Sequence, residues 1–231
     1  MRRELAPARR LRFALALEAL EAFAAGRALR VLDAGCGDGA FAEAIARRHP
    51  GWSVVGADVA DELLDRGRAA LAGLPNVELV HADLTGDLGT GVYDAVASIE
   101  SLEEIPDDGA ALRRMVAALR PGGLFVAHVP ELDWKPALPG SEAIWRNEVR
   151  HGYEAGELAS RLRELGLEDV HVEGTSRSLV RAAQELRDRV PQQRPGLRAA
   201  VSSALAFTVP LERAGLSWGR GRSLFARAVA R

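Results

Sequence analysis

Apolar and polar residues follow two different periods along the first half of the chain. Short apolar runs predict five strands, over residues 29–33, 53–57, 77–81, 93–98 and 124–129. Between them, apolar residues recur every three or four positions and predict helices over 41–48 and 61–74 and from residue 107. Strands that alternate with helices are typical of a parallel sheet with helices on both faces.

The same patterns continue on both sides of this region. The other predicted elements are helices over 11–25, 154–165, 178–189 and 197–209 and strands over 167–173 and 223–230. An irregular stretch from residue 130 to 152 separates the fifth strand from the next helix and is rich in aromatic residues and histidine. Because it follows the carboxyl end of a strand, we expect this long connection to act as a lid.

A glycine-rich turn follows the first predicted strand. Gly35, Gly37 and Gly39 stand at alternate positions before the helix that starts at Phe41. A strand, a tight glycine turn and a helix in this order are typical of a Rossmann-like nucleotide site, where the ligand lies at the carboxyl ends of the strands. The polar residues at or just after the predicted strand ends are Asp33, Asp58, Asp83 and Ser98.

Two classes of nucleotide fit this turn. Gly35-x-Gly37-x-x-Ala40 satisfies the relaxed dinucleotide fingerprint, and Asp58 is near the expected acidic position. However, Asp33 precedes the first glycine where a dinucleotide strand is usually apolar, and Asp83 is placed to meet an adenine amino group. An NAD-dependent oxidoreductase therefore remains an alternative function, with less support than a mononucleoside cofactor.

In five segments the chain resembles the class I S-adenosylmethionine-dependent methyltransferases. The matching segments are residues 31–39, 56–58, 82–84, 93–96 and 119–124. The resemblance implies an α/β fold with a Rossmann-like seven-stranded sheet, mostly parallel with an antiparallel last strand. Helices would cover both faces, and extra helices would stand at both ends. It also implies methyl transfer to a small-molecule acceptor, which we expect to be a hydroxyl of a sugar, lipid precursor or secondary metabolite.

The resemblance implies S-adenosylmethionine as cofactor and S-adenosylhomocysteine as its product. The glycine turn would line the methionine part, Asp58 would accept both ribose hydroxyls, and Asp83 would accept from the adenine amino group. Asp33 would lie near the methionine amine. The full set of candidate cofactor residues is Asp33, Gly35, Cys36, Gly37, Asp58, Val59, Asp83, Leu84 and Ser98. For Asp58 and Asp83 a cap of a helix or turn is the alternative role.

The domain organisation follows from these segments. We expect one domain over residues 1–231, with an N-terminal helix at 1–28 and a cofactor-binding half at 29–130. The lid and the substrate-side helices would occupy 131–222, and the last strand 223–231.

The candidates for chemistry on the acceptor are Glu100, His151 and Tyr153. A hydroxyl acceptor needs a general base, and His151 has a suitable pKa range, although a turn histidine bonded to backbone fits as well. Tyr153 fits a packing residue better than a catalytic one. Glu100 directly follows the fourth strand and could contact substrate or be a solvated loop acid. We expect His128, within the fifth strand, to be a core or pocket-wall histidine.

Charge and composition limit the partners. A formal net charge of −2 argues against nucleic acid as an obligate partner, because phosphate binding needs a basic surplus. Cys36 is the only cysteine, so no intrachain disulfide forms, and the five histidines show no metal-ligand spacing, so we expect no metal.

Association and location are expectations from the same residues. We expect a cytoplasmic protein without a transmembrane segment, monomeric or homodimeric. The apolar segment 197–209 is too short to span a bilayer but could contact a membrane surface or form a dimer face. A non-catalytic cofactor-binding module is the remaining alternative.

Overall fold

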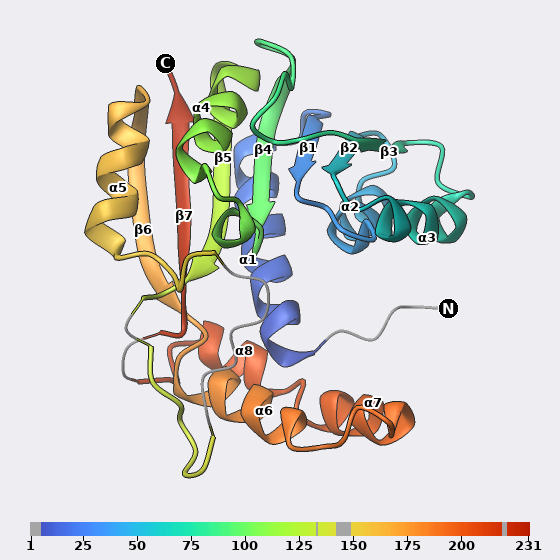
Figure 1. Cartoon of the computed structure of the whole chain (residues 1–231), viewed down its shortest axis with the longest axis vertical. Coiled ribbons are helices and arrows are strands. Elements are labelled where there is room, and N and C mark those ends of the chain that lie inside the picture. The colour runs from blue at the N-terminus through green and yellow to red at the C-terminus, as the bar shows by residue number, and fades with distance from the viewer. Residues whose placement is uncertain (1–5, 133, 142–148, 219–220) are drawn as a thin grey trace.

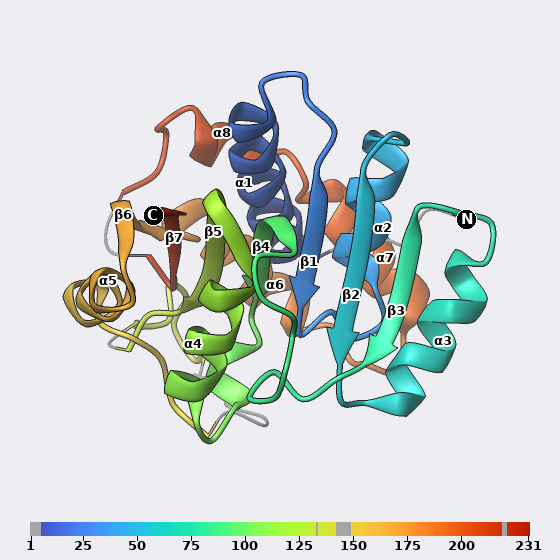
Figure 2. The ribbon, with the colours of Figure 1, turned by 90° about the horizontal axis from the view of Figure 1, so that it is seen from above.

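Seven strands form a single sheet in the part of the chain that the computed structural model describes, residues 6–132, 134–141, 149–218 and 221–231. The strands are β1 Arg30–Ala34, β2 Ser53–Asp58, β3 Val77–His81, β4 Tyr93–Ile99, β5 Leu119–Pro130, β6 Leu167–Thr175 and β7 Ser223–Ala230. Their order is β3-β2-β1-β4-β5-β7-β6, and β7 runs antiparallel to both of its neighbours (Figure 2). The predicted mostly parallel sheet with an antiparallel last strand is confirmed.

Helices cover both faces of this sheet and the end of it. The helices are α1 Pro7–Ala24, α2 Ala40–Arg48, α3 Asp61–Leu71, α4 Asp108–Ala118, α5 Ala155–Glu164, α6 Ser178–Asp188, α7 Pro195–Ala204 and α8 Thr208–Arg213, with a 3-10 turn η1 Leu102–Glu104. One hydrophobic core contains residues of α1, α2 and α3, and a second contains residues of α4 and α5. Helices α6, α7 and α8 lie beyond the carboxyl ends of β1, β4 and β5 (Figure 1).

Alternation along the central strands divides their side chains between the two cores. In β1, Val31 packs on the side of α1 to α3, whereas Leu32 and Ala34 pack on the side of α4 and α5. In β5, Phe125 packs with α4 and α5, and its neighbour Val126 packs on the opposite face. The two cores hold the strands rigidly and leave their carboxyl ends free to carry polar groups.

Some predicted boundaries were wrong. The helix predicted over 197–209 is broken into α7 and α8 because Pro210 has no N–H, so it cannot bond the Ala206 carbonyl and continue one helix. α1 begins at Pro7, four residues before the predicted start, since proline is favoured in the first turn of a helix. The segment 120–123 lies within β5, opposite a shift in register between Tyr93 and Ala95.

The predicted lid is described only in part, because residues 142–148 lie outside the described residues. Of the helices that the structure describes, none combines the length and the apolar character that crossing a membrane requires.

Candidate active site

The glycine turn after β1 is bonded to β2 and packs against the loop after β4. The amide of Gly35 donates to the carbonyl oxygen of Ala57 in β2 at 2.8 Å. A Cβ on Gly35 would stand 2.2 Å from Cβ of Ser101, so glycine is needed for the loop after β4 to approach. At Gly37, with φ +54°, an added Cβ would meet only Leu63, at 3.8 Å. The turn is therefore packed at its first glycine and open at its second.

Asp58 closes this turn from the end of β2. One carboxylate oxygen accepts from the amide of Gly37 at 2.7 Å, and the other accepts from the amide of Ala60 at 2.9 Å. Each carboxylate oxygen has two lone pairs, so both oxygens can accept one more donor. The adjacent Val59 is 57% exposed, which leaves an apolar surface beside the carboxylate.

Asp83 lies exposed two residues after β3. Its Oδ1 accepts both the amide and the hydroxyl of Thr85 at 2.8 Å. These hydrogen bonds, the backbone one first, lower the pKa of Asp83. Its Oδ2 accepts no hydrogen bond from the described residues. The following residue, Leu84, is buried.

The remaining candidate cofactor residues are buried. Asp33 accepts from the amide of Ala42 at 3.1 Å, and burial raises its pKa to about 7. Burial also raises the pKa of the Cys36 thiol, so it stays protonated and is no nucleophile at neutral pH. Ser98 is within hydrogen-bonding distance of Ser101, 2.7 Å between the hydroxyl oxygens, and Ser101 is also 3.1 Å from the Ala34 carbonyl.

Asp33 should make the stability of the fold depend on pH. Its folded pKa of about 7 lies above the unfolded value of about 4, so the folded protein keeps a proton that the unfolded chain has released. Stability should therefore fall as pH rises from 4 to 7. The free energy of unfolding is measured with urea at pH 5 and at pH 8. Between these two pH values we expect it to fall by about 2 kcal/mol more in the wild type than in Asp33→Asn. The same loss in both proteins would contradict the buried, protonated carboxyl.

A cavity of about 900 Å³ lies at the carboxyl ends of β4 and β5. Its walls come from α1, α6, α7, the segment 134–141 and the start of β7. On the side of the sheet it is lined by Glu100 and His128. His128 lies in β5, and Glu100 directly follows β4. The two residues are neighbours because His128 pairs with Ile99 in the β4–β5 ladder. Glu100 is thus brought to a cavity, whereas His151 is exposed and does not line it.

Glu100 is held on both of its oxygens. Oε1 is 2.8 Å from Nδ1 of His128, and Oε2 is 2.6 Å from Nη1 of Arg12. Burial alone would raise the pKa of Glu100, but Arg12 and His128 outweigh it and bring the pKa to about 2. Burial lowers the pKa of His128, so its imidazole is neutral at pH 7 and Nδ1–H donates to the ionised carboxylate.

The backbone of Glu100 is strained. Its φ is +55°, in the left-handed region that a residue with a side chain rarely adopts. The amide of Glu100 donates to the carbonyl of His128 at 2.8 Å, which holds this conformation. Strain of this kind is often kept where a side chain must be aimed at a ligand.

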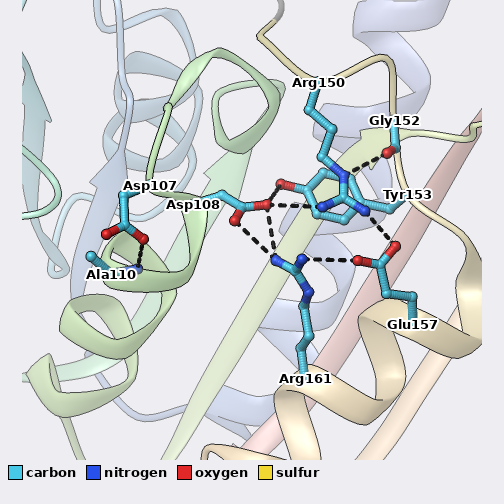
Figure 3. A network of polar contacts seen from close by, with 8 residues as sticks. All are labelled: Asp107, Asp108, Ala110, Arg150, Gly152, Tyr153, Glu157 and Arg161. Atoms are coloured by element: carbon cyan, nitrogen blue, oxygen red, sulfur yellow. Dashed lines mark hydrogen bonds and ion pairs between the residues drawn. The ribbon is translucent and has the colours of Figure 1, made fainter.

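Tyr153 belongs to a different cluster, whose polar contacts Figure 3 shows, and it packs in the core that contains residues of α4 and α5. It is fully buried, and its hydroxyl donates to Oδ2 of Asp108 at 2.7 Å. Arg161 bonds both oxygens of Asp108, at 2.9 and 3.0 Å. Arg150 stacks over the Tyr153 ring at 4.3 Å and pairs with Glu157. The cluster ties the start of α4 to α5, and Tyr153 does not line the cavity.

Tyr153→Phe should therefore cost stability and not turnover. Removing the hydroxyl leaves Asp108 with its two arginines, so we expect a loss of about 1–2 kcal/mol in the free energy of unfolding. kcat should be unchanged. Tyr93→Phe is the matched control, because Tyr93 begins β4 and Glu100 and the cavity lie at the other end of that strand. A tenfold fall in kcat with unchanged stability would instead make the Tyr153 hydroxyl part of the reaction.

Arg222 is a cavity residue that no sequence signal had indicated, whereas Trp134 belongs to the stretch predicted as a lid. Arg222 directly precedes β7, and its guanidinium stacks over the ring of Trp134 at 4.5 Å. Because β7 is antiparallel, its first residues lie at the same edge of the sheet as the carboxyl ends of β4 and β5. Only the predicted direction of the last strand could have placed Arg222 here.

Comparisons with known proteins identify the family. Residues 2–172 match the family described as "Methyltransferase domain". The ubiquinone biosynthesis O-methyltransferase of Xanthomonas oryzae pv. oryzae (strain PXO99A) is 39% identical over 158 residues, 61% of this chain and 64% of that protein. The protein of the same name from Bordetella avium (strain 197N) is 35% identical over 159 residues, 63% of this chain and 64% of its own length. The match thus spans slightly less than two thirds of these relatives.

A solved structure shows the same fold. The Haemonchus contortus phosphoethanolamine N-methyltransferase 2, in complex with S-adenosyl-L-methionine, superposes with a TM-score of 0.67. It is 19% identical, and the superposition covers 94% of this chain and 52% of that one. Similarity at this level of identity concerns the fold alone.

Proposed function

This chain belongs to the class I S-adenosylmethionine-dependent methyltransferases, and from that premise we propose that it methylates a hydroxyl of a small molecule bound in the cavity. One observation supports this proposal above the others. Asp33, Asp58 and Asp83 lie at the carboxyl ends of β1, β2 and β3, and Glu100 and His128 lie at those of β4 and β5. The residues that we propose for the methyl donor and those that we propose for the acceptor thus lie along one edge of the sheet.

The residues at β1 to β3 fit the cofactor. Both oxygens of Asp58 can take ribose hydroxyls beside their amide donors, and the free oxygen of Asp83 suits an adenine amino group. The exposed Val59 offers an apolar surface to a purine ring. When bound, S-adenosylmethionine would supply a methyl group on a sulfonium, from which neutral S-adenosylhomocysteine is a good leaving group.

We propose that Glu100 accepts the proton of the acceptor hydroxyl. As the new carbon–oxygen bond forms, the acceptor oxygen becomes positively charged and its proton strongly acidic. An ionised carboxylate can then take the proton although its own pKa is only about 2. Arg12 and His128 each hold one oxygen of Glu100, which fixes the direction of the carboxylate toward the cavity.

The choice of a hydroxyl rests on two arguments. The relatives matched over most of the chain are named as O-methyltransferases, and a carboxylate at the cavity wall suits an acceptor that loses a proton. Sugars, lipid precursors and secondary metabolites all carry such hydroxyls. An NAD-dependent oxidoreductase gains no support from the family match.

Titration calorimetry with S-adenosylhomocysteine and NAD tests the cofactor part of this proposal. We expect S-adenosylhomocysteine to bind in one molar equivalent and NAD not to bind at the same concentration. Binding of NAD without binding of S-adenosylhomocysteine would overturn it.

A further inference from the structure

The cavity carries more positive than negative side chains. Among the described residues, its lining arginines are Arg9, Arg12, Arg187, Arg189, Arg198 and Arg222. Its lining acids are Glu100, Glu104, Glu185 and Asp188. The whole chain has a formal net charge of −2, so this positive surplus opposes the average of the molecule. A concave surface with a surplus of one sign attracts ligands of the other sign.

Three carboxylates of the cavity already have partners in the protein. The two oxygens of Glu185 accept the amides of Ala137 and Leu138 at 2.7 and 2.8 Å. Asp188 pairs with Arg187 and Arg198, at 2.8 and 3.1 Å. Since Glu100 is held by Arg12 and His128, these three acids already have protein donors and do not pair with Arg222.

Arg222 has no carboxylate partner. Its guanidinium makes no hydrogen bond or ion pair with any residue that the structure describes, and it lies over the ring of Trp134, 4.5 Å from the centroid. Burial lowers the pKa of Arg222, and the positive charge of Arg12 lowers it further against the opposing effect of Glu100. A guanidinium that stacks on an aromatic ring keeps its N–H donors, which lie in its own plane, available for an oxyanion.

The backbone around Arg222 is fixed in advance. Its amide donates to the carbonyls of Thr175 and Ser176 at 3.0 and 3.2 Å, and its carbonyl accepts from Glu131 at 2.9 Å. A Cβ on the preceding Gly221 would stand 2.3 Å from the Thr175 oxygen, so this close approach requires glycine. Binding a ligand through Arg222 therefore needs little ordering of the chain.

We propose that Arg222 binds an oxyanion of the acceptor, so that the methylated molecule carries a carboxylate or phosphate besides its hydroxyl. This inference rests on the proposed function, because it concerns the same cavity. Glu100 and Arg222 both line this cavity, so the anion and the reacting hydroxyl of one acceptor would lie in the same cavity. Arg12 and Arg222 together balance both the anion and the Glu100 carboxylate.

Binding of small probes tests this inference. Titration calorimetry with S-adenosylhomocysteine present compares 4-hydroxybenzoate and phenyl phosphate with the neutral 4-hydroxybenzamide. We expect one of the anions to bind at least about tenfold more tightly than the amide, and its identity tells carboxylate from phosphate recognition. Arg222→Gln should weaken the binding of that anion by about 10–100-fold, and Arg222→Lys should weaken it less. Arg163→Gln, an exposed arginine on α5, is the matched control and should bind like the wild type.

The outcomes separate this inference from the proposed function. Equal binding of the amide and both anions by the wild type, or binding of neither anion, would overturn the role of Arg222. Unchanged anion binding in Arg222→Gln would do the same. Titration of each variant with S-adenosylhomocysteine shows that it is folded, and a wild type that fails to bind S-adenosylhomocysteine contradicts the proposed function instead. If Arg222→Gln does not fold, the preference of the wild type for an anion and the Arg222→Lys variant decide the question.

Discussion

Replacing Glu100 with glutamine is expected to lower kcat by about two orders of magnitude. The amide keeps the shape of the side chain but cannot take the proton of the acceptor hydroxyl. The substitution also removes the carboxylate that pairs with Arg12 and the charged hydrogen-bond acceptor of His128. The affinity for S-adenosylhomocysteine should not change, because Glu100 stands at the end of β4 and Asp58 at the end of β2, with β1 between them. Initial rates with saturating cofactor measure the effect.

Glu104→Gln is the matched control for this variant. Glu104 also lines the cavity, and its replacement by glutamine removes the same charge. Unlike Glu100, Glu104 is not bonded to His128. We expect its kcat to stay within threefold of the wild type. If Glu100→Gln turned over like Glu104→Gln, or if both variants lost kcat alike, Glu100 would not be the proton acceptor.

Asp58→Ala is expected to weaken S-adenosylhomocysteine binding by about 10–100-fold. The variant removes both charged hydrogen bonds proposed for the ribose. It also frees the amides of Gly37 and Ala60, which now hold the turn in place. Asp58→Asn should lose less, since an amide oxygen can still accept one hydrogen bond. Calorimetry gives the affinity of each variant.

Asp65→Ala serves as the control for Asp58→Ala. Asp65 is an exposed carboxylate on α3, and among the described residues it pairs only with Arg68 on the same helix. It should bind S-adenosylhomocysteine like the wild type. Equal affinities for the wild type and Asp58→Ala would rule out the ribose role and leave Asp58 as a cap of the turn.

The strands and the glycine turn could be predicted because their signals are local. An apolar run that ends in Asp33 or Asp58 predicts a strand, and it also predicts the edge of the sheet at which the carboxylate lies. The break of the helix predicted over 197–209 also has a local cause, Pro210, which lies one residue beyond the predicted end. Sequence-based prediction therefore succeeds where a single local feature, either the hydrophobic period or a glycine or proline, determines the conformation.

The cavity could not be predicted because its contacts join distant positions. Arg12 meets Glu100, His128 meets Thr175, and Arg222 meets Trp134, and no spacing in the sequence records these pairs. The irregular stretch before α5 suggested catalytic roles for His151 and Tyr153, but its residue types do not say which of them faces the cavity. Tyr153 is instead buried in the core beside α4 and α5, where its hydroxyl bonds Asp108.

Transfer of a labelled methyl group into a small molecule tests the proposed reaction most directly. Wild-type protein is incubated with S-adenosylmethionine labelled in the methyl group and a pool of hydroxylated metabolites, and the products are separated by mass. The expected result is a labelled methyl ether, formed by the wild type and reduced about a hundredfold with Glu100→Gln. Wild-type protein that binds S-adenosylhomocysteine but labels no small molecule, or labels only macromolecules, would contradict it.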